Sequence, residues 1–288
     1  MRVNVQPDRP NPTLGQPPGW YNRAGMIDHT LMLDEMLVHY TLTGCGPDVI
    51  LIHGWAASRR MWLHLCEVLG QNFRCWALDL PGFGDSDKPA EDWYSIPNYT
   101  AVMHRFMHAH GLERARMVGH SMGGMIALDF AATYPEAVER LVVINPVVTG
   151  RPYLHPLVQQ VWSRRLFRWG LRLSPMMGSL VRHPLVDRLH PGFKHLRRRG
   201  EDFGKGTEES FWGSSRAIVT HNLEPHLERI TAPTLVILGD QDAMVSNREG
   251  QLAAERIPGA RQVVLRAGHL PTDDHLDETL QLIEEFFA

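Results

Sequence analysis

The stretch Val118-Gly119-His120-Ser121-Met122-Gly123-Gly124 decides the fold of this chain. A short apolar run precedes it, and a helix-like run follows it from Met125 to Ala132. This order predicts a strand, a sharp turn and a helix, with Ser121 on the turn. Because such a turn is tight, the residues two before and two after the serine must be small, and glycine stands at both positions. Ser121 is therefore a candidate nucleophile at a helix N-terminus, where the helix dipole favours developing negative charge.

Length and composition narrow the class of protein. The chain has 288 residues, 43% hydrophobic and 21% charged, which is typical of one large α/β domain with an insertion, or of two domains. The formal net charge of −3 gives no argument for binding nucleic acid. No apolar run approaches the roughly 20 residues that cross a membrane, and the five prolines of residues 1–25 are unlike a secretory signal. We expect no stable membrane insertion.

Three cysteines, Cys45, Cys66 and Cys75, lack the spacing of a metal site. We interpret them as buried free thiols in a reducing compartment, and we expect a cytoplasmic location. The histidines form no metal-spaced set either, so we expect no catalytic metal and no cofactor.

Apolar runs alternate with helical stretches along most of the chain. Runs typical of strands buried on both faces of a parallel sheet occupy residues 49–52, 74–78, 140–145, 234–238 and 262–265. Residues 27–33 and 36–42 predict two strands joined by a tight turn at Asp34-Glu35. Helical periodicity marks residues 96–110 and 272–287, and we also expect a helix over residues 59–70. Together these elements predict an open, mostly parallel sheet with helices on both faces.

The alternation breaks between residues 149 and 229. That segment carries 14 Lys and Arg against 7 Asp and Glu, an excess of +7, so the rest of the chain sums to −10. We interpret residues 149–229 as a helical insertion between core segments 26–148 and 230–288, preceded by a proline-rich extension over residues 1–25. We interpret its basic run Arg197–Arg199 as a solvated face or a contact with the acidic core; an anionic substrate or a lipid surface is the alternative.

A serine hydroxyl needs a base within hydrogen-bond reach, and the base needs a carboxylate to orient it. Ser121, Asp242 and His269 each follow a predicted strand, where open α/β sheets place their sites. Asp240 follows the same strand as Asp242 and is its rival. His120 adjoins the serine, but neighbours at a sharp turn point in different directions, so we interpret His120 as structural.

Residues 27–287 resemble the α/β-hydrolase superfamily, and within it the capped esterase- and lipase-like members. Four features carry this resemblance, and they occur along the chain in the order found in the family. These features are His53-Gly54-Trp55, the loop Asp79–Ser86, the glycine-flanked Ser121, and Asp242 with Gly268-His269. The resemblance implies an eight-stranded, mostly parallel sheet with an inserted helical cap. Its Ser–Asp–His chain order implies the catalytic triad Ser121, Asp242 and His269. Family members place the acid three residues after the strand-ending glycine, here Gly239, which favours Asp242 over Asp240.

The same resemblance implies an oxyanion hole formed by the backbone N–H groups of Trp55 and Met122, with His53 bracing the loop. A serine nucleophile favours acyl transfer to water, because relatives that act on haloalkanes or epoxides carry aspartate at that position. We therefore expect a serine hydrolase that cleaves small carboxylic esters with apolar acyl or alcohol groups. The aromatic and methionine side chains of the insertion either line an apolar pocket or form the core of the cap; they are Trp162, Phe167, Trp169, Met176, Met177, Phe193, Phe203, Phe211 and Trp212.

Three alternatives remain. Some relatives hydrolyse carbon–carbon bonds of ring-cleavage products, but those usually carry Gly-Pro-Gly after the first His-Gly, where this chain has Trp55-Ala56-Ala57-Ser58. Others, with methionine after the serine, make peracids without a cofactor; Met122 fits them, although they tend to lack a large cap. A third group are small-molecule receptors that keep the triad, and slow turnover with ligand-dependent partner binding would identify that group.

Overall fold

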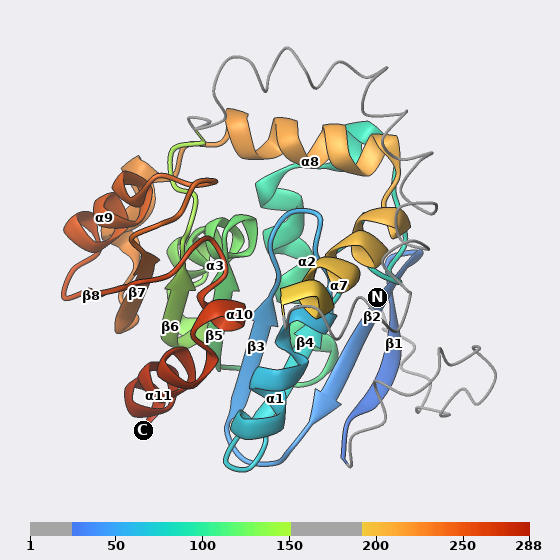
Figure 1. The fold of residues 1–288 in the computed structure, drawn as a ribbon. Helices are drawn as coiled ribbons and strands as arrows, with labels where there is room; N and C mark the ends of the chain where they lie inside the picture. Colours follow the sequence, from blue (N-terminus) through green and yellow to red (C-terminus); the bar gives the residue numbers. More distant parts are fainter. Residues whose placement is uncertain (1–24, 151–191) are drawn as a thin grey trace.

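The computed structural model describes residues 25–150 and 192–288, with side chains from residue 198 onward in the second part (Figure 1). Most of the N-terminal extension lies outside the described residues. So do the first part of the insertion, with Trp162, Phe167, Trp169, Met176 and Met177, and the side chains of Phe193 and Arg197.

Eight strands form one sheet in the order β1-β2-β4-β3-β5-β6-β7-β8. Strand β2 is antiparallel to both of its neighbours, and β3 to β8 all run parallel. The predicted mostly parallel sheet is confirmed. The strands are β1 (Ile27–Leu33), β2 (Met36–Thr43), β3 (Asp48–Ile52), β4 (Arg74–Leu78), β5 (Ala115–His120), β6 (Val138–Ile144), β7 (Thr234–Gly239) and β8 (Arg261–Leu265).

Helices cover both faces of the sheet, as the alternating sequence predicted (Figure 1). Successive strand residues point to opposite faces, so Ile50 and Ile52 of β3 join one apolar cluster and Val49 and Leu51 join the other. The first cluster includes residues of α2 (Ile96–Ala109), α3 (Met122–Thr133) and α9 (Asn247–Arg256). The second includes residues of α1 (Leu63–Leu69) and α11 (Leu276–Phe287).

Helix boundaries differ from the predictions in two places. The helix expected over residues 59–70 begins as a 3-10 turn, η1 (Arg59–Trp62), before α1, and Ser58 caps that turn by accepting the Arg60 N–H at 3.3 Å. The helix expected over 272–287 is divided into α10 (Pro271–Asp274) and α11, because His275 leaves helical geometry with φ −139° and ψ 58°. Helix α9 was not predicted. Further 3-10 turns are η2 (Glu91–Trp93), η3 (Pro135–Ala137) and η4 (Glu224–Arg229).

The described part of the insertion is helical. It contains α7 (Gly192–Lys205) and α8 (Glu208–Thr220), which lie between β6 and β7 in sequence. Figure 1 draws both in orange shades, with α8 across the end of the molecule beyond α2 and β3. Within residues 25–150 and 192–288, no helix is long and apolar enough to span a bilayer.

Candidate active site

The backbone at Ser121 has an uncommon conformation, with φ 54° and ψ −116°. A positive φ in a residue other than glycine is strained and is concentrated at functional sites. The Ser121 N–H donates to the Ile144 carbonyl at 3.0 Å, which ties the turn to the end of β6. Ser121 therefore stands between the end of β5 and the first residue of α3, as the sequence predicted.

Close backbone packing explains the two glycines around this turn. A Cβ on Gly119 would lie 2.4 Å from the Gly123 carbonyl oxygen, and one on Gly123 would lie 2.2 Å from the Ile52 oxygen. Neither backbone oxygen can move aside without disturbing a strand or a helix. The small-residue requirement is therefore confirmed, and it brings the N-terminus of α3 against the end of β3.

His269 and Asp242 form a hydrogen-bonded pair. Nδ1 of His269 donates to Oδ2 of Asp242 at 2.7 Å. The other oxygen, Oδ1, accepts the Met244 and Val245 N–H groups at 2.7 and 2.9 Å, and the Asp242 side chain is fully buried. With its proton held on Nδ1, the neutral imidazole presents Nε2 as a proton acceptor.

Asp240, the rival carboxylate, lies elsewhere. Its residue is exposed, and its backbone N–H donates to the Leu265 carbonyl at 2.9 Å. The structure therefore brings Asp242, and not Asp240, to the imidazole of His269.

Two polar residues hold the backbone of the His269 loop. His120 contacts the His269 carbonyl through Nε2 at 2.8 Å; a carbonyl only accepts, so Nε2 carries the proton. Burial, and then the nearby His269, keep the pKa of His120 well below its usual range, so its ring is neutral. This contact fits the structural role predicted for His120.

Asn145 is the second of these residues, and the sequence analysis missed it. Its Nδ2 donates to the carbonyls of Gly268 and His269 at 3.2 and 3.0 Å, while its Oδ1 accepts the Gly239 N–H at 2.8 Å. Asn145 has φ 44°, a conformation that asparagine tolerates better than most residues. A polar residue directly after a buried strand was the signal that could have identified it.

The loop after β3 lies beside the serine. A Cβ on Gly54 would lie 3.2 Å from the Ser121 Cβ. His53, fully buried, donates from Nδ1 to the Gly54 carbonyl at 2.8 Å and accepts the Leu80 N–H at Nε2 at 3.0 Å. Burial lowers the pKa of His53, which keeps its ring neutral. His53 thus braces this loop against the loop after β4, as expected.

A buried ion pair between Arg59 and Asp79 also joins the loop after β3 to the loop after β4. Oδ1 of Asp79 accepts the Arg59 N–H at 2.6 Å, Oδ2 accepts the Asp85 N–H at 2.8 Å, and the Arg59 guanidinium pairs with the same carboxylate. A Cβ on Gly84 would lie 2.2 Å from this carboxylate, and Gly84 has φ 53°. The Asp79–Ser86 loop therefore has a structural role here.

The inserted helices α7 and α8 each contact the core. Arg198 of α7 pairs with Asp273 at 2.7 Å, with both side chains largely buried. This confirms the predicted contact between the basic run and the core for Arg198. Phe211 of α8 is buried against Trp55, with ring centroids 5.3 Å apart, so its ring packs on the core.

One prediction about the cysteines is corrected. Cys66 and Cys75 are buried as expected, but Cys45 is exposed, because the glycine-rich loop that carries it lies at the surface. Among residues 25–150 and 192–288, no three His, Cys, Asp or Glu side chains gather into a group that would hold a metal ion.

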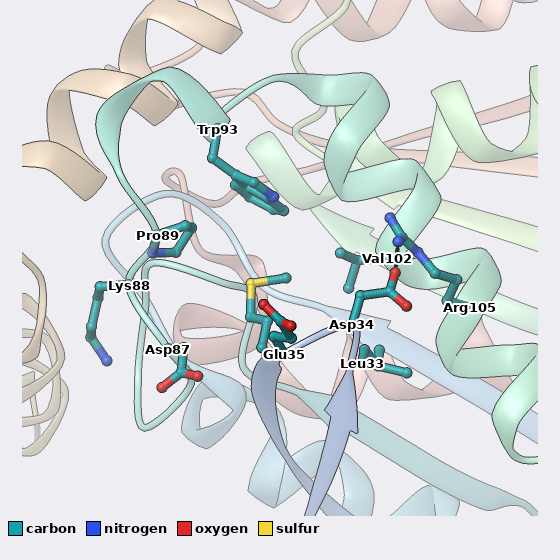
Figure 2. Close-up of a pocket in the computed structure, with 10 residues that line it drawn as sticks. Leu33, Asp34, Glu35, Asp87, Lys88, Pro89, Trp93, Val102 and Arg105 are labelled. Carbon is teal, nitrogen blue, oxygen red and sulfur yellow. Dashed lines mark hydrogen bonds and ion pairs between the residues drawn. The ribbon is translucent and has the colours of Figure 1, made fainter. Parts of the chain in front are cut away.

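A cavity of about 410 Å³ lies at the β1–β2 turn, and Figure 2 shows the side chains that line it. Charged and apolar side chains share its walls, and Arg105 pairs with Asp34 across one side. None of the five predicted site residues lines it. The lining residues are Leu33, Asp34, Glu35, Met36, Asp87, Lys88, Pro89, Trp93, Val102 and Arg105.

Comparisons with known proteins agree with this architecture. A family model described as alpha/beta hydrolase fold matches residues 47–276. The chain is 30% identical over 263 residues to a pimeloyl-[acyl-carrier protein] methyl ester esterase of Stenotrophomonas maltophilia (strain K279a), covering 87% of this chain and 96% of the relative. It is 29% identical over 265 residues to a 2-hydroxy-6-oxo-6-phenylhexa-2,4-dienoate hydrolase of Comamonas testosteroni, covering 88% and 92%.

Among solved structures, the chain is similar to that of a membrane phospholipase A described as a novel bacterial virulence factor. The TM-score is 0.73 at 28% identity, covering 91% of this chain and 86% of the other. These three proteins are thus a methyl ester esterase, a dienoate hydrolase and a phospholipase A by name.

Proposed function

The chain belongs to the family with the alpha/beta hydrolase fold, and on that basis we propose that it is a serine hydrolase that cleaves carboxylic esters through an acyl-enzyme intermediate. The observation that carries this proposal is the 2.7 Å bond between His269 Nδ1 and Asp242 Oδ2, which leaves Nε2 as the base. Asp242 and His269 follow the carboxyl ends of β7 and β8, and Ser121 follows that of β5, on a strained turn at a helix N-terminus.

Acylation begins when Ser121 Oγ attacks the ester carbonyl carbon and its proton passes to Nε2 of His269. Asp242 stabilises the resulting imidazolium and keeps its proton on Nδ1. When the tetrahedral intermediate collapses, the carbon–oxygen bond to the alcohol breaks and Nε2 returns the proton to the leaving alkoxide. The acyl group remains on Ser121 as an ester.

Deacylation repeats these steps with water as the nucleophile. His269 Nε2 takes a proton from water, the hydroxide adds to the acyl carbon, and collapse releases the acid and regenerates the Ser121 hydroxyl. In both halves the carbonyl oxygen gains negative charge. We assign its stabilisation to the backbone N–H groups of Met122, at the free N-terminus of α3, and of Trp55, on the loop beside Ser121.

We propose esters with apolar acyl or alcohol groups as the substrate class, with α7 and α8 acting as a cap. The methyl ester esterase and phospholipase A relatives support an ester substrate. The aromatic cluster of Trp55, Phe83 and Phe211, where α8 meets the loops of the core, supports apolar surroundings near the reacting carbonyl.

Hydrolysis of p-nitrophenyl esters, from acetate to a long acyl chain, tests the proposal with wild type and Ser121→Ala side by side. We expect turnover by the wild type and its loss in Ser121→Ala, with the chain-length optimum reporting pocket size. Wild-type protein without turnover, or turnover that survives Ser121→Ala, would reject the ester hydrolase. Thermal unfolding of the two proteins controls for misfolding.

The second candidate is hydrolysis of a carbon–carbon bond, favoured by the dienoate hydrolase relative. The protein is incubated with a ring-cleavage dienoate, and the loss of the visible absorbance of that dienoate is recorded. This assay separates carbon–carbon hydrolysis from ester hydrolysis. The perhydrolase alternative depends on Met122, whose side chain is fully buried in the apolar cluster on the α3 face. A triad-retaining receptor would turn over all of these substrates slowly.

A further inference from the structure

The loop from Gly54 to Arg59 is anchored to the core on its inner side. His53 donates to the Gly54 carbonyl at 2.8 Å, and the Asp79 carboxylate accepts the Arg59 N–H at 2.6 Å. These bonds fix the two ends of the loop. Between them lie Trp55, whose backbone N–H we assign to the oxyanion, and Ala56, which has a positive φ of 58°.

The outer side of the same loop is held by the inserted helices. Nε1 of Trp55 donates to Oγ of Ser214 in α8 at 3.0 Å. The hydroxyl of Ser58 donates to Oδ1 of Asp202 in α7 at 2.7 Å. These partners are 159 and 144 residues apart in sequence, so each bond joins the insertion directly to the proposed oxyanion loop.

The buried carboxyl group of Asp202 has an unfavourable desolvation free energy. Its side chain is 2% exposed, and burial raises its pKa to about 6 in spite of the Ser58 hydrogen bond and the nearby charge of Arg60. A buried carboxylate destabilises a fold unless polar partners compensate. The hydrolytic steps above use neither Asp202 nor Ser214, so their contacts with this loop require another explanation.

We infer that Asp202 and Ser214 are positioning residues, through which α7 and α8 hold the Trp55–Ser58 loop in the shape that directs the Trp55 N–H toward the oxyanion. This inference rests on the proposed serine hydrolase function. Only Ala56 and Ala57 separate Trp55 from Ser58, so a shift at Ser58 turns the peptide that carries the donor. Docking of the insertion then governs kcat as well as access to the site.

A cap that only forms a pocket wall makes a different prediction. Loss of wall contacts weakens binding of long acyl chains, which raises KM for those esters and leaves a short ester unaffected. Loss of a positioned donor lowers kcat for every ester, because each one forms the same oxyanion. Parallel kinetics on p-nitrophenyl acetate and p-nitrophenyl octanoate therefore separate the two roles.

The first test compares Asp202→Leu with Asp202→Asn. Leucine has the same branched shape, with larger methyl groups in place of the two oxygens, and cannot accept the Ser58 hydrogen bond, whereas asparagine can. Complete removal of an oxyanion donor costs about 10²–10³ in turnover, so we expect a misdirected donor in Asp202→Leu to cost roughly 10-fold in kcat on both esters, with little change in KM. Asp202→Asn should recover most of that loss. Glu201→Gln, at the neighbouring carboxylate of α7, is the matched control and should behave as wild type.

The second test removes the other contact and does not depend on the first variant folding. Ser214→Ala deletes one oxygen and removes the hydrogen bond from Trp55 Nε1 to Ser214 Oγ. We expect a several-fold loss of kcat on both esters. In a Trp55→Phe background the same change should have little further effect, because the hydrogen bond is already absent.

Each variant is also assayed by its rate of phosphonylation by a small alkyl fluorophosphonate, whose phosphoryl oxygen needs the same donors. Slower phosphonylation of Asp202→Leu and Ser214→Ala supports the inference even if the wild type hydrolyses no ester, which would reject only the substrate class. Wild-type kcat and phosphonylation rate in both variants, or a KM effect confined to octanoate, overturns the inference. A wild type inert to both reagents overturns the proposed function and the inference together.

Discussion

Nδ1 of His269 lies 2.7 Å from Oδ2 of Asp242, a carboxylate with no solvent-exposed side-chain surface. Two backbone N–H groups bind its other oxygen. The carboxylate is therefore held independently of the imidazole and determines both the orientation of the ring and the nitrogen that carries the proton. The base of the proposed mechanism depends on this relationship.

Asp242→Asn should lower kcat by about 10³–10⁴-fold, because an amide can donate to Nδ1 and so stabilise the wrong tautomer. Asp240→Asn is the matched control on the same loop and should stay within about two-fold of wild type, because Asp240 is exposed. Steady-state kinetics on a p-nitrophenyl ester measure both. Equal losses in the two variants would refute the assignment of Asp242.

Asn145→Asp tests how the His269 loop is held. Aspartate keeps the acceptor for the Gly239 N–H and tolerates the positive φ, but it cannot donate to the carbonyls of Gly268 and His269. Those carbonyls would then face a carboxylate, which repels them and displaces the loop. We expect roughly a 10-fold loss of kcat with KM nearly unchanged. A lower melting temperature without any loss of kcat would show that Asn145 serves stability alone.

Gly123→Ala should destabilise the fold, because the new methyl group would lie 2.2 and 2.5 Å from the carbonyl oxygens of Ile52 and His53. Overpacking against fixed backbone costs about 1–3 kcal/mol or more, so we expect a melting temperature roughly 5–10 °C lower. Gly200→Ala adds the same group to α7 with nothing within 4 Å and should be neutral or slightly stabilising. Calorimetry on both variants makes the comparison; an unchanged melting temperature in Gly123→Ala would contradict the packing described for the Ser121 turn.

Asp202 should make stability depend on pH. Burial raises the pKa of its carboxyl from 3.8 to about 6, and the negative charge of Asp79 adds to this rise. The Ser58 hydrogen bond and the positive charges of Arg60 and Arg198 favour the carboxylate and lower the pKa, but they do not offset the effect of burial. A raised pKa means that the folded state binds the proton more tightly, so the contribution of Asp202 to stability is fully present below about pH 4 and is lost as pH rises through 6.

The measurement is the melting temperature of wild type minus that of Asp202→Asn, from pH 4 to pH 7. We expect this difference to fall by a few degrees as pH rises. Subtracting the variant removes the titration of all other groups. A difference that stays flat, or that grows with pH, would contradict the raised pKa.

Local patterns made much of the fold predictable. A strand buried on both faces needs a continuous apolar run, and residues 49–52 and 234–238 are such runs, rich in β-branched residues and too short for a helix. The steric demand of the Ser121 turn is equally local, so the two glycines were informative. Asp34 and Glu35 have φ values of 46° and 68°, as the tight hairpin turn predicted at these residues requires.

Contacts between distant segments were not predictable from such patterns. Helix α9 follows a Ser246-to-Glu249 spacing typical of a helix start, yet it is too polar for periodicity to reveal. Glu249 itself binds the backbone N–H groups of Val148 and Thr149, about 100 residues away. The bonds of Asp202 and Ser214 to the loop after β3 are of the same kind, because no local pattern encodes them.

The most direct test of the central claim follows ester hydrolysis and covalent labelling in the same sample. The protein is titrated with an alkyl fluorophosphonate, the remaining p-nitrophenyl ester hydrolysis is recorded, and the adduct is located by mass spectrometry of tryptic peptides. A serine hydrolase acting through Ser121 predicts that hydrolysis falls in proportion to one adduct on the peptide of residues 117–140, in which Ser121 is the only serine. Hydrolysis that persists in fully labelled protein, or an adduct on another residue, would contradict the account.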